Sequence, residues 1–164
     1  MSAEFELTDA MRAVIGVESS PWPVEVTTTS SRAYARGVGY TDLVYFDEAK
    51  AKAAGYSSLP LAPTFPGTPV FIPGQSNSTF SSPPTDGPSL NHGLKNVLDG
   101  GTELVYERPL VAGDRLMMTS KISNLEVKES KGLGKMLIIT NHQEYRDAES
   151  GDLVVTVVGQ GIFY

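Results

Sequence analysis

Two histidines are the side chains of this sequence best suited to transfer protons near neutral pH. His142 lies in a run of strand-forming residues, where a histidine is more often packed or solvent-facing than catalytic. His92 stands beside Gly93 at the border of an irregular, proline-rich segment, and such loops often carry functional groups. His92 is therefore a candidate catalytic residue.

Other common reaction centres are missing from the sequence. The chain has no cysteine, which excludes disulfides, thiolate metal sites and thiol nucleophiles. The two histidines are too far apart for a paired zinc motif, and no Gly-x-Ser-x-Gly sequence marks a nucleophilic serine. The glycines near Lys131 do not form a phosphate-binding loop, because Glu129 and Met136 occupy positions that the motif requires for Gly and for Ser or Thr. We therefore expect no metal and no cofactor.

The composition is typical of one globular domain. The 164 residues are 40% hydrophobic and 20% charged, which is enough for a single core. Thirteen basic residues against 19 acidic ones give a net charge of -6, so a basic surface for nucleic acid is not expected. The first residues are acidic, and no apolar run approaches the roughly 18 residues of a membrane helix. We expect a cytoplasmic protein whose partners are neither nucleic acid nor membrane.

Short helices are expected in the first third of the chain, where they would position any site beside the sheet. A first helix can begin at Thr8, a second at Ser30 or Ser31, and a third at Asp47, because these side chains cap helix N-termini. Between the first two helices, residues 24–26 are expected to be extended.

The second half of the chain predicts an antiparallel sheet. Clustered prolines predict an irregular loop at residues 76–89. Beyond it come four extended runs separated by turn residues, at residues 103–107, 115–128, 135–145 and 153–164. Helices followed by a meander indicate an α+β fold in which residues 1–164 form one domain. The curled sheet would wrap around helical segments drawn from residues 32–80.

Two motifs resemble the MaoC-like dehydratases, a hot-dog family that includes R-specific enoyl-CoA hydratases and (3R)-hydroxyacyl-ACP dehydratases. The first runs from Asp42 through Phe46-Asp47-Glu48-Ala49 to Tyr56 and is followed by Leu-Ala-Pro-Thr-Phe at residues 61–65. The second is Arg-Pro-Leu-Val-Ala-Gly-Asp-Arg-Leu at residues 108–116. The resemblance implies a single hot-dog domain. It also implies an acyl pocket near Pro63, Thr64 and Phe65, with Phe65 assigned to the core rather than to ligand contact.

In active members of the family, the Asp and His of an Asp-x-Asn-Pro-x-His loop hold the water that adds to the enoyl double bond. When the two sequences are anchored on Phe46-Asp47-Glu48-Ala49, these positions fall on Tyr40 and Tyr45. A phenol with a pKa near 10 is a poor general base at neutral pH. Asp42, two residues after Tyr40, could substitute only if the loop shifted register.

The resemblance leaves two functions open. The chain can be an acyl-binding subunit that pairs with a hot-dog subunit carrying the Asp and His. Alternatively, it can be an independent enzyme that acts on an acyl thioester or another small substrate with Tyr40, Asp42, Tyr45 or His92. A hot-dog thioesterase is less favoured, because no acid stands at the required position of the helix. The substrate would be an acyl-CoA or an acyl carrier protein conjugate.

A dimer is also expected, either a homodimer or a heterodimer. The last strand, at residues 153–164, is apolar on both faces, and an isolated hot-dog sheet has open edges that need cover.

Overall fold

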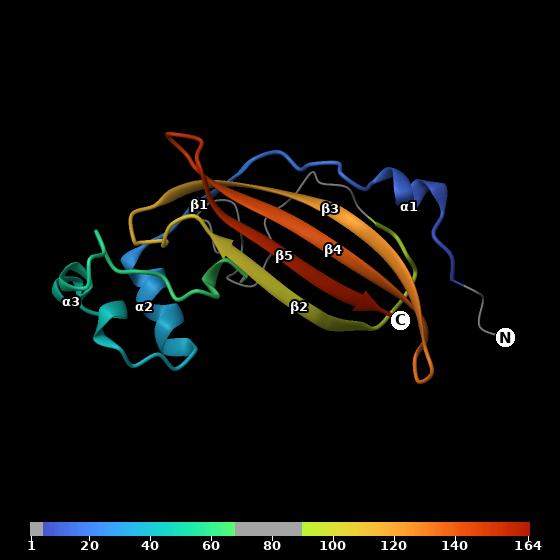
Figure 1. Ribbon diagram of the computed structural model, residues 1–164, viewed down its shortest axis with the longest axis horizontal. Coiled ribbons are helices and arrows are strands. Elements are labelled where there is room, and N and C mark those ends of the chain that lie inside the picture. The colour runs from blue at the N-terminus through green and yellow to red at the C-terminus, as the bar shows by residue number, and fades with distance from the viewer. Residues whose placement is uncertain (1–4, 68–89) are drawn as a thin grey trace.

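The computed structural model describes residues 5–67 and 90–164 of the chain. These residues form a five-stranded antiparallel sheet with short helices beside both ends, two beside one and one beside the other (Figure 1). The strands are β1 (Trp22–Glu25), β2 (Val97–Tyr106), β3 (Arg115–Ser130), β4 (Gly134–Asp147) and β5 (Leu153–Phe163). The loop predicted at residues 76–89 lies outside the described residues, as does the end of the helical range that was expected to reach residue 80.

The three longest strands form the two consecutive hairpins that the sequence predicts. β3 pairs with β4 and β4 pairs with β5, so that Met118, Tyr145 and Val155 lie side by side. The turns between them contain Gly134 and Gly151, whose φ angles of 73° and 78° are unfavourable for other residues. The last strand, β5, lies inside the sheet between β4 and β2, so both of its edges are paired.

The position of β2 corrects the simple meander. β2 pairs with β5, where Leu104 lies opposite Val157, and not with β3, which follows it in the chain. The edge of β3 that β2 would need is occupied by β1, where Val24 lies opposite Leu116. The strand order is therefore β1-β3-β4-β5-β2, and the connection from β2 to β3 crosses the end of the sheet.

β2 also begins earlier than predicted, at Val97. Asp99 and the following glycines interrupt its apolar pattern and form a bulge against β5. At Gly100 a Cβ atom would lie 2.9 Å from the Cβ of Gln160, so only glycine fits this close approach. Gly100 and Gly101 therefore lie within β2, although the strand was predicted to begin only after them, at residue 103.

The helices predicted from capping residues are present, and they are short. They are α1 (Asp9–Ala13), α2 (Thr28–Gly37) and α3 (Glu48–Ala53). Thr8 accepts a hydrogen bond from the third residue of α1, and Asp47 accepts two backbone hydrogen bonds at the start of α3, as expected. Among residues 5–67 and 90–164, no helix has the length and apolar character needed to cross a membrane.

α2 begins earlier than predicted, because its cap is Thr27 and not Ser30 or Ser31. Thr27 and Ser30 form a reciprocal capping box, in which each side chain accepts the backbone N–H of the other residue. Ser31 is 1% exposed and its hydroxyl donates to the Pro60 carbonyl, so it ties α2 to a later segment.

Two apolar clusters cover the inner face of the sheet. The larger lies at the α2 end and combines strand residues with the segment that follows α3; its buried members are Val24, Val26, Leu61, Phe65, Leu110, Leu116, Met118, Tyr145, Val154, Val155 and Val157. The second lies toward α1, and its buried members are Ile122, Leu125, Leu137 and Ile139. The sheet therefore has one apolar face with two separately covered ends.

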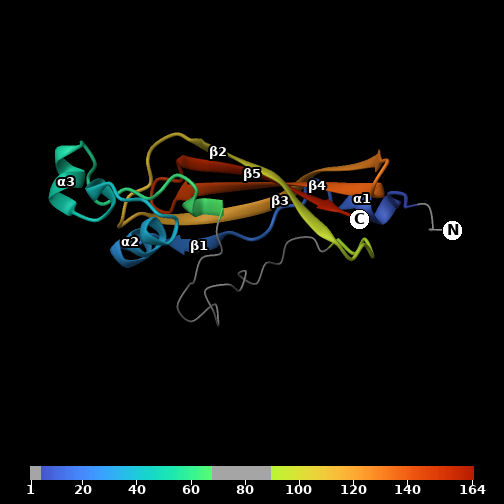
Figure 2. The same cartoon turned by 90° about the horizontal axis from the view of Figure 1, so that it is seen from below.

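The two edges of the sheet differ. The N-terminal segment runs from α1 to β1 along the outer edge of β3, with single bridges from Ile15 and Glu18 (Figures 1 and 2). The outer edge of β2 has no paired segment among the described residues, and Val97, Leu98 and Val105 are exposed there.

Candidate functional site

A pocket of about 290 Å³ opens at one end of the sheet, between the segments that flank α3 and the β2–β3 connection. Its floor is apolar, because Leu61 and Leu110 belong to the larger core cluster and Tyr106 packs against that cluster. The remaining lining residues are Tyr45, Tyr56, Pro60, Pro63, Glu107, Arg108 and Pro109. The first motif and the Arg-Pro motif therefore face one cavity.

The loop before α3 contributes one wall of this pocket. The rings of Tyr40 and Tyr45 lie 4.8 Å apart at 57°, and Tyr45 reaches the pocket while Tyr40 stays 38% exposed. Asp42 lies between them in sequence, and its carboxylate accepts the Val44 N–H at 3.0 Å to cap the 3₁₀ turn Leu43–Tyr45. Three of the predicted catalytic residues are thus brought to one loop.

The phenol of Tyr45 is held in its protonated form. Burial raises the pKa of Tyr45 above its ordinary value of 10.0, and the neighbouring Tyr40, Tyr56 and Asp42 raise it further. At neutral pH this hydroxyl can donate or accept a hydrogen bond, but it is a weaker base than a free phenolate would be.

Of the three residues predicted to bind substrate, Pro63 faces the pocket. Thr64 is exposed, and its hydroxyl lies 2.7 Å from that of Tyr34 on α2. Phe65 is 7% exposed and packs edge-on against Tyr34 with the ring centroids 5.3 Å apart, so it belongs to the core.

His92 lies at the other end of the sheet. Its ring packs against Phe163 with the centroids 4.4 Å apart, and its Nδ1 accepts the Leu94 N–H. The ten residues of β2, roughly 30 Å in length, separate His92 from the pocket. Within one chain, His92 is therefore too far from Tyr45 to act together with it. His142 lies on β4 beside Glu144 at 3.4 Å and is not among the residues that line the pocket.

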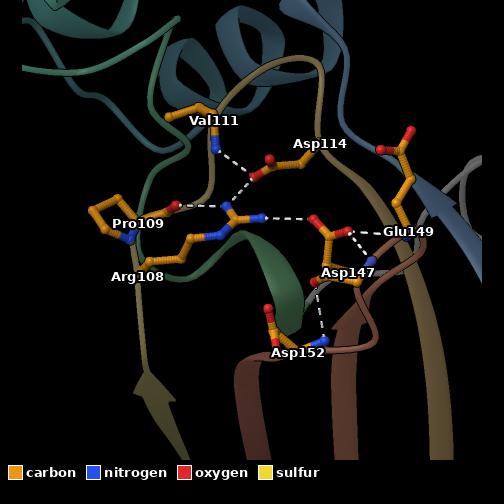
Figure 3. Close-up of polar contacts among 8 residues, drawn as sticks. Arg108, Pro109, Val111, Asp114, Asp147, Glu149 and Asp152 are labelled. Carbon is orange, nitrogen blue, oxygen red and sulfur yellow. Dashed lines mark hydrogen bonds and ion pairs between the residues drawn. The ribbon is translucent and has the colours of Figure 1, made fainter.

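The Arg-Pro motif lines the pocket and also builds a cross-linked turn, whose polar contacts are shown in Figure 3. Arg108 donates to Asp114 at 2.8 Å and to Asp147 at 3.2 Å, and so joins the end of β2 to β3 and β4. Asp114 also accepts the Val111 N–H at 2.9 Å. The motif spacing therefore places one guanidinium between two carboxylates.

These contacts keep the network charged. The hydrogen bond to Asp114 is the largest cause of the raised pKa of Arg108. The pKa of Asp147 is lowered, first because the backbone amides of Ser150 and Glu149 donate to its carboxylate and then because Arg108 lies beside it. A guanidinium engaged by two carboxylates has little charge left for an anionic ligand.

Sequence reasoning missed several lining residues. Tyr106 and Glu107 directly precede the Arg-Pro motif, and Tyr56 ends the first motif. Their proximity to the motifs is a signal that could have identified them. Glu107 is the carboxylate among the pocket-lining residues. Within the described parts of the chain, no three His, Asp or Glu side chains are arranged to hold a metal ion.

The family model for the FAS1-like dehydratase domain region matches residues 13–157. The chain belongs to this family. A relative named UPF0336 protein, from Streptomyces avermitilis, is 33% identical to this FAS1-like dehydratase-domain chain over 138 residues, which cover 83% of the chain and 82% of the relative.

Solved structures show which fold the FAS1-like dehydratase domain adopts here. The C-terminally truncated HadBC (3R-hydroxyacyl-ACP dehydratase) complex from Mycobacterium tuberculosis has a TM-score of 0.63 at 19% identity, covering 91% of this chain and 96% of that one. A MaoC-like dehydratase has a TM-score of 0.69 at 23% identity, covering 93% of this chain and 42% of that one. The hot-dog fold and the MaoC-like resemblance are confirmed.

Proposed function

We propose that this chain is an acyl-binding subunit of a hetero-oligomeric (3R)-hydroxyacyl thioester dehydratase or enoyl hydratase in fatty-acid metabolism. The observation that carries the proposal is a pocket with an apolar floor, bordered by a loop whose two aligned catalytic positions are Tyr40 and Tyr45. Such a pocket suits an acyl chain, because apolar lining with a few polar groups is typical of small-molecule sites.

The same residues support binding without efficient chemistry by this chain alone. Tyr45 keeps its proton, and the Asp42 carboxylate is engaged as a cap. Neither histidine lines the pocket. Without an Asp and a His at the two aligned positions, a contribution of about 10²- to 10⁴-fold per group is missing. A second subunit with an Asp-x-Asn-Pro-x-His loop would supply both groups.

The open edge of β2 supports an assembly of two chains. This ten-residue edge strand exposes Val97, Leu98 and Val105, and an unpaired strand of this length is a ready surface for pairing with another strand. The HadBC neighbour is itself a complex of two kinds of chain. We place the partner at this edge, as a second hot-dog subunit or a second copy.

A second candidate function is favoured by Glu107. Its carboxylate and the Tyr45 hydroxyl line the same pocket, which is the minimum set for an independent enzyme with a non-standard acid and base. In that case the chain would act on an acyl thioester or another small substrate without a partner.

The deciding experiment measures binding and turnover separately. We expect the isolated chain to bind a saturated acyl-CoA in calorimetry and to hydrate the corresponding trans-2-enoyl-CoA slowly or not at all. Turnover should appear when a hot-dog subunit with an intact Asp-x-Asn-Pro-x-His loop is added. Strong turnover by the isolated chain that collapses in Glu107→Gln or Asp42→Asn, but not in His92→Ala, would instead identify the independent enzyme.

A further inference from the structure

The segment after α3 contains three prolines at a spacing of three residues, and each of their carbonyl groups accepts a side-chain hydroxyl. We call residues 59–66 the strap. Pro60 accepts from Ser31 at 2.9 Å, Pro63 from Tyr106 at 2.6 Å, and Pro66 from Tyr145 at 2.9 Å. The three donors come from α2, β2 and β4, so the strap is attached to three separate elements.

Proline chemistry explains why these hydroxyls are needed. A proline offers a carbonyl oxygen but no backbone N–H, so a proline-rich segment cannot join a sheet through a regular ladder. The strap makes two backbone hydrogen bonds to the β2–β3 connection: Leu61 donates to Leu110 at 2.9 Å, and Ala112 donates to Leu59 at 2.8 Å. Pro60 and Pro66 are buried, whereas Pro63 is exposed. A buried carbonyl without a partner is costly, and the hydroxyls of Ser31 and Tyr145 supply the partners at the two buried prolines.

Two of the three donors are deeply buried. Ser31 is 1% exposed and Tyr145 is 5% exposed, so water does not readily replace their hydrogen bonds. Burial raises the pKa of both Tyr106 and Tyr145 to about 12, and these phenols therefore remain donors throughout the physiological range. The strap is held by hydroxyls that keep their protons.

The strap is also a wall of the pocket, because Pro60, Leu61 and Pro63 line it. Ser31 and Tyr145 do not line the pocket, and any effect they have on a ligand must pass through the strap. Tyr106 does both, since its ring lines the pocket while its hydroxyl holds the Pro63 carbonyl.

We propose that Ser31, Tyr106 and Tyr145 are positioning residues that fix the strap as a rigid wall, and that their hydroxyls thereby set the affinity of the pocket for an acyl group. This inference rests on the proposed acyl-binding function. A wall that is already in place before binding saves the ligand the cost of ordering it, so loss of a hydroxyl should weaken binding without removing any ligand contact.

The test uses Tyr145→Phe and Ser31→Ala in the full chain, because both remove a hydroxyl outside the pocket and retain most of the side-chain volume. We expect each variant to bind hexanoyl-CoA about three- to tenfold more weakly in calorimetry, the range that corresponds to losing one neutral hydrogen bond. Amide hydrogen exchange at Leu61 should accelerate by a similar factor. Tyr164→Phe, which removes a phenol hydroxyl from the opposite end of the sheet, is the control and should change neither quantity.

The outcomes separate this inference from the proposed function. Unchanged affinity in both variants, whether or not Leu61 exchange accelerates, would overturn the positioning role. If the wild-type chain does not bind hexanoyl-CoA, the proposed function fails, and accelerated exchange in both variants would still support the hydroxyls as the attachment of the strap. Should one variant fail to fold, as judged by circular dichroism, the other decides the result.

Discussion

The end of the sheet beside α2 and α3 combines an apolar core with polar cross-links, whereas the end beside α1 relies on apolar packing. At the first end, hydroxyls hold the strap and Arg108 joins three strands through Asp114 and Asp147. At the other end, Leu137 and its neighbours pack beneath α1. Apolar burial stabilises both ends, but directional hydrogen bonds fix the geometry of a wall, and those that attach the strap lie at the end with the pocket.

The largest effect is expected from a core residue at the α1 end. Leu137 is 0% exposed, so Leu137→Ala should lower the free energy of unfolding by about 3 kcal/mol, through lost apolar burial and the cavity left behind. Urea titration measures this loss. If the two ends are independent, the folded variant should still bind hexanoyl-CoA as the wild type does. A matching loss of affinity would show that the ends are coupled.

Arg108→Ala tests the polar end. The substitution leaves the carboxylates of Asp114, whose side chain is 12% exposed, and Asp147 without their shared counter-charge. We expect the free energy of unfolding, measured by urea titration, to fall by about 2 kcal/mol. Acyl binding should weaken as well, because Arg108 borders the pocket. The matched control is Arg115→Ala, since Arg115 lies 3.8 Å from Glu25 and both side chains are more than half exposed. Equal losses in the two variants would contradict a special role for the network.

How much of the fold the sequence predicts depends on whether the strand pairing is local. The hairpins of β3, β4 and β5 follow from local patterns, because each apolar run ends at a glycine-containing turn. The pairing of β2 with β5 is not local, so turn residues and apolar alternation do not predict it. The early start of β2 is concealed by Gly100, which serves close packing rather than a turn.

Site residues that were predicted from motif spacing lie at the pocket more often than those chosen for their position beside a loop. Tyr45 and Pro63 were identified by motif spacing, and both line the pocket. His92 was chosen because it borders an irregular segment, and closeness in sequence to that segment does not bring it to the pocket, because β2 carries the chain along the whole sheet. Tyr106 was overlooked although it lies two residues before Arg108. Its hydrogen bond to the strap, in contrast, depends on which strand faces the strap, and only the tertiary structure determines that.

The smallest expected effect is a dependence of stability on pH, which arises from Tyr145 at the end beside α2 and α3. The pKa of Tyr145 is raised from 10.0 to about 12 in the folded chain, chiefly by burial and then by Tyr106. Between these values the unfolded chain loses the phenol proton while the folded chain keeps it, so the stabilisation is complete below pH 10 and declines as the pH rises toward 12. By pH 11 the free energy of unfolding of the wild type should have fallen by about 1 kcal/mol through this group.

The variant Tyr145→Phe tests this effect. It has a lower free energy of unfolding at pH 9 but no phenol at this position to ionise, so its urea midpoint should fall less between pH 9 and pH 11. Tyr164→Phe should follow the wild-type slope. Parallel slopes for all three proteins would mean that the Tyr145 phenol ionises as readily in the folded chain as in the unfolded one, which would contradict a buried phenol that donates to the Pro66 carbonyl.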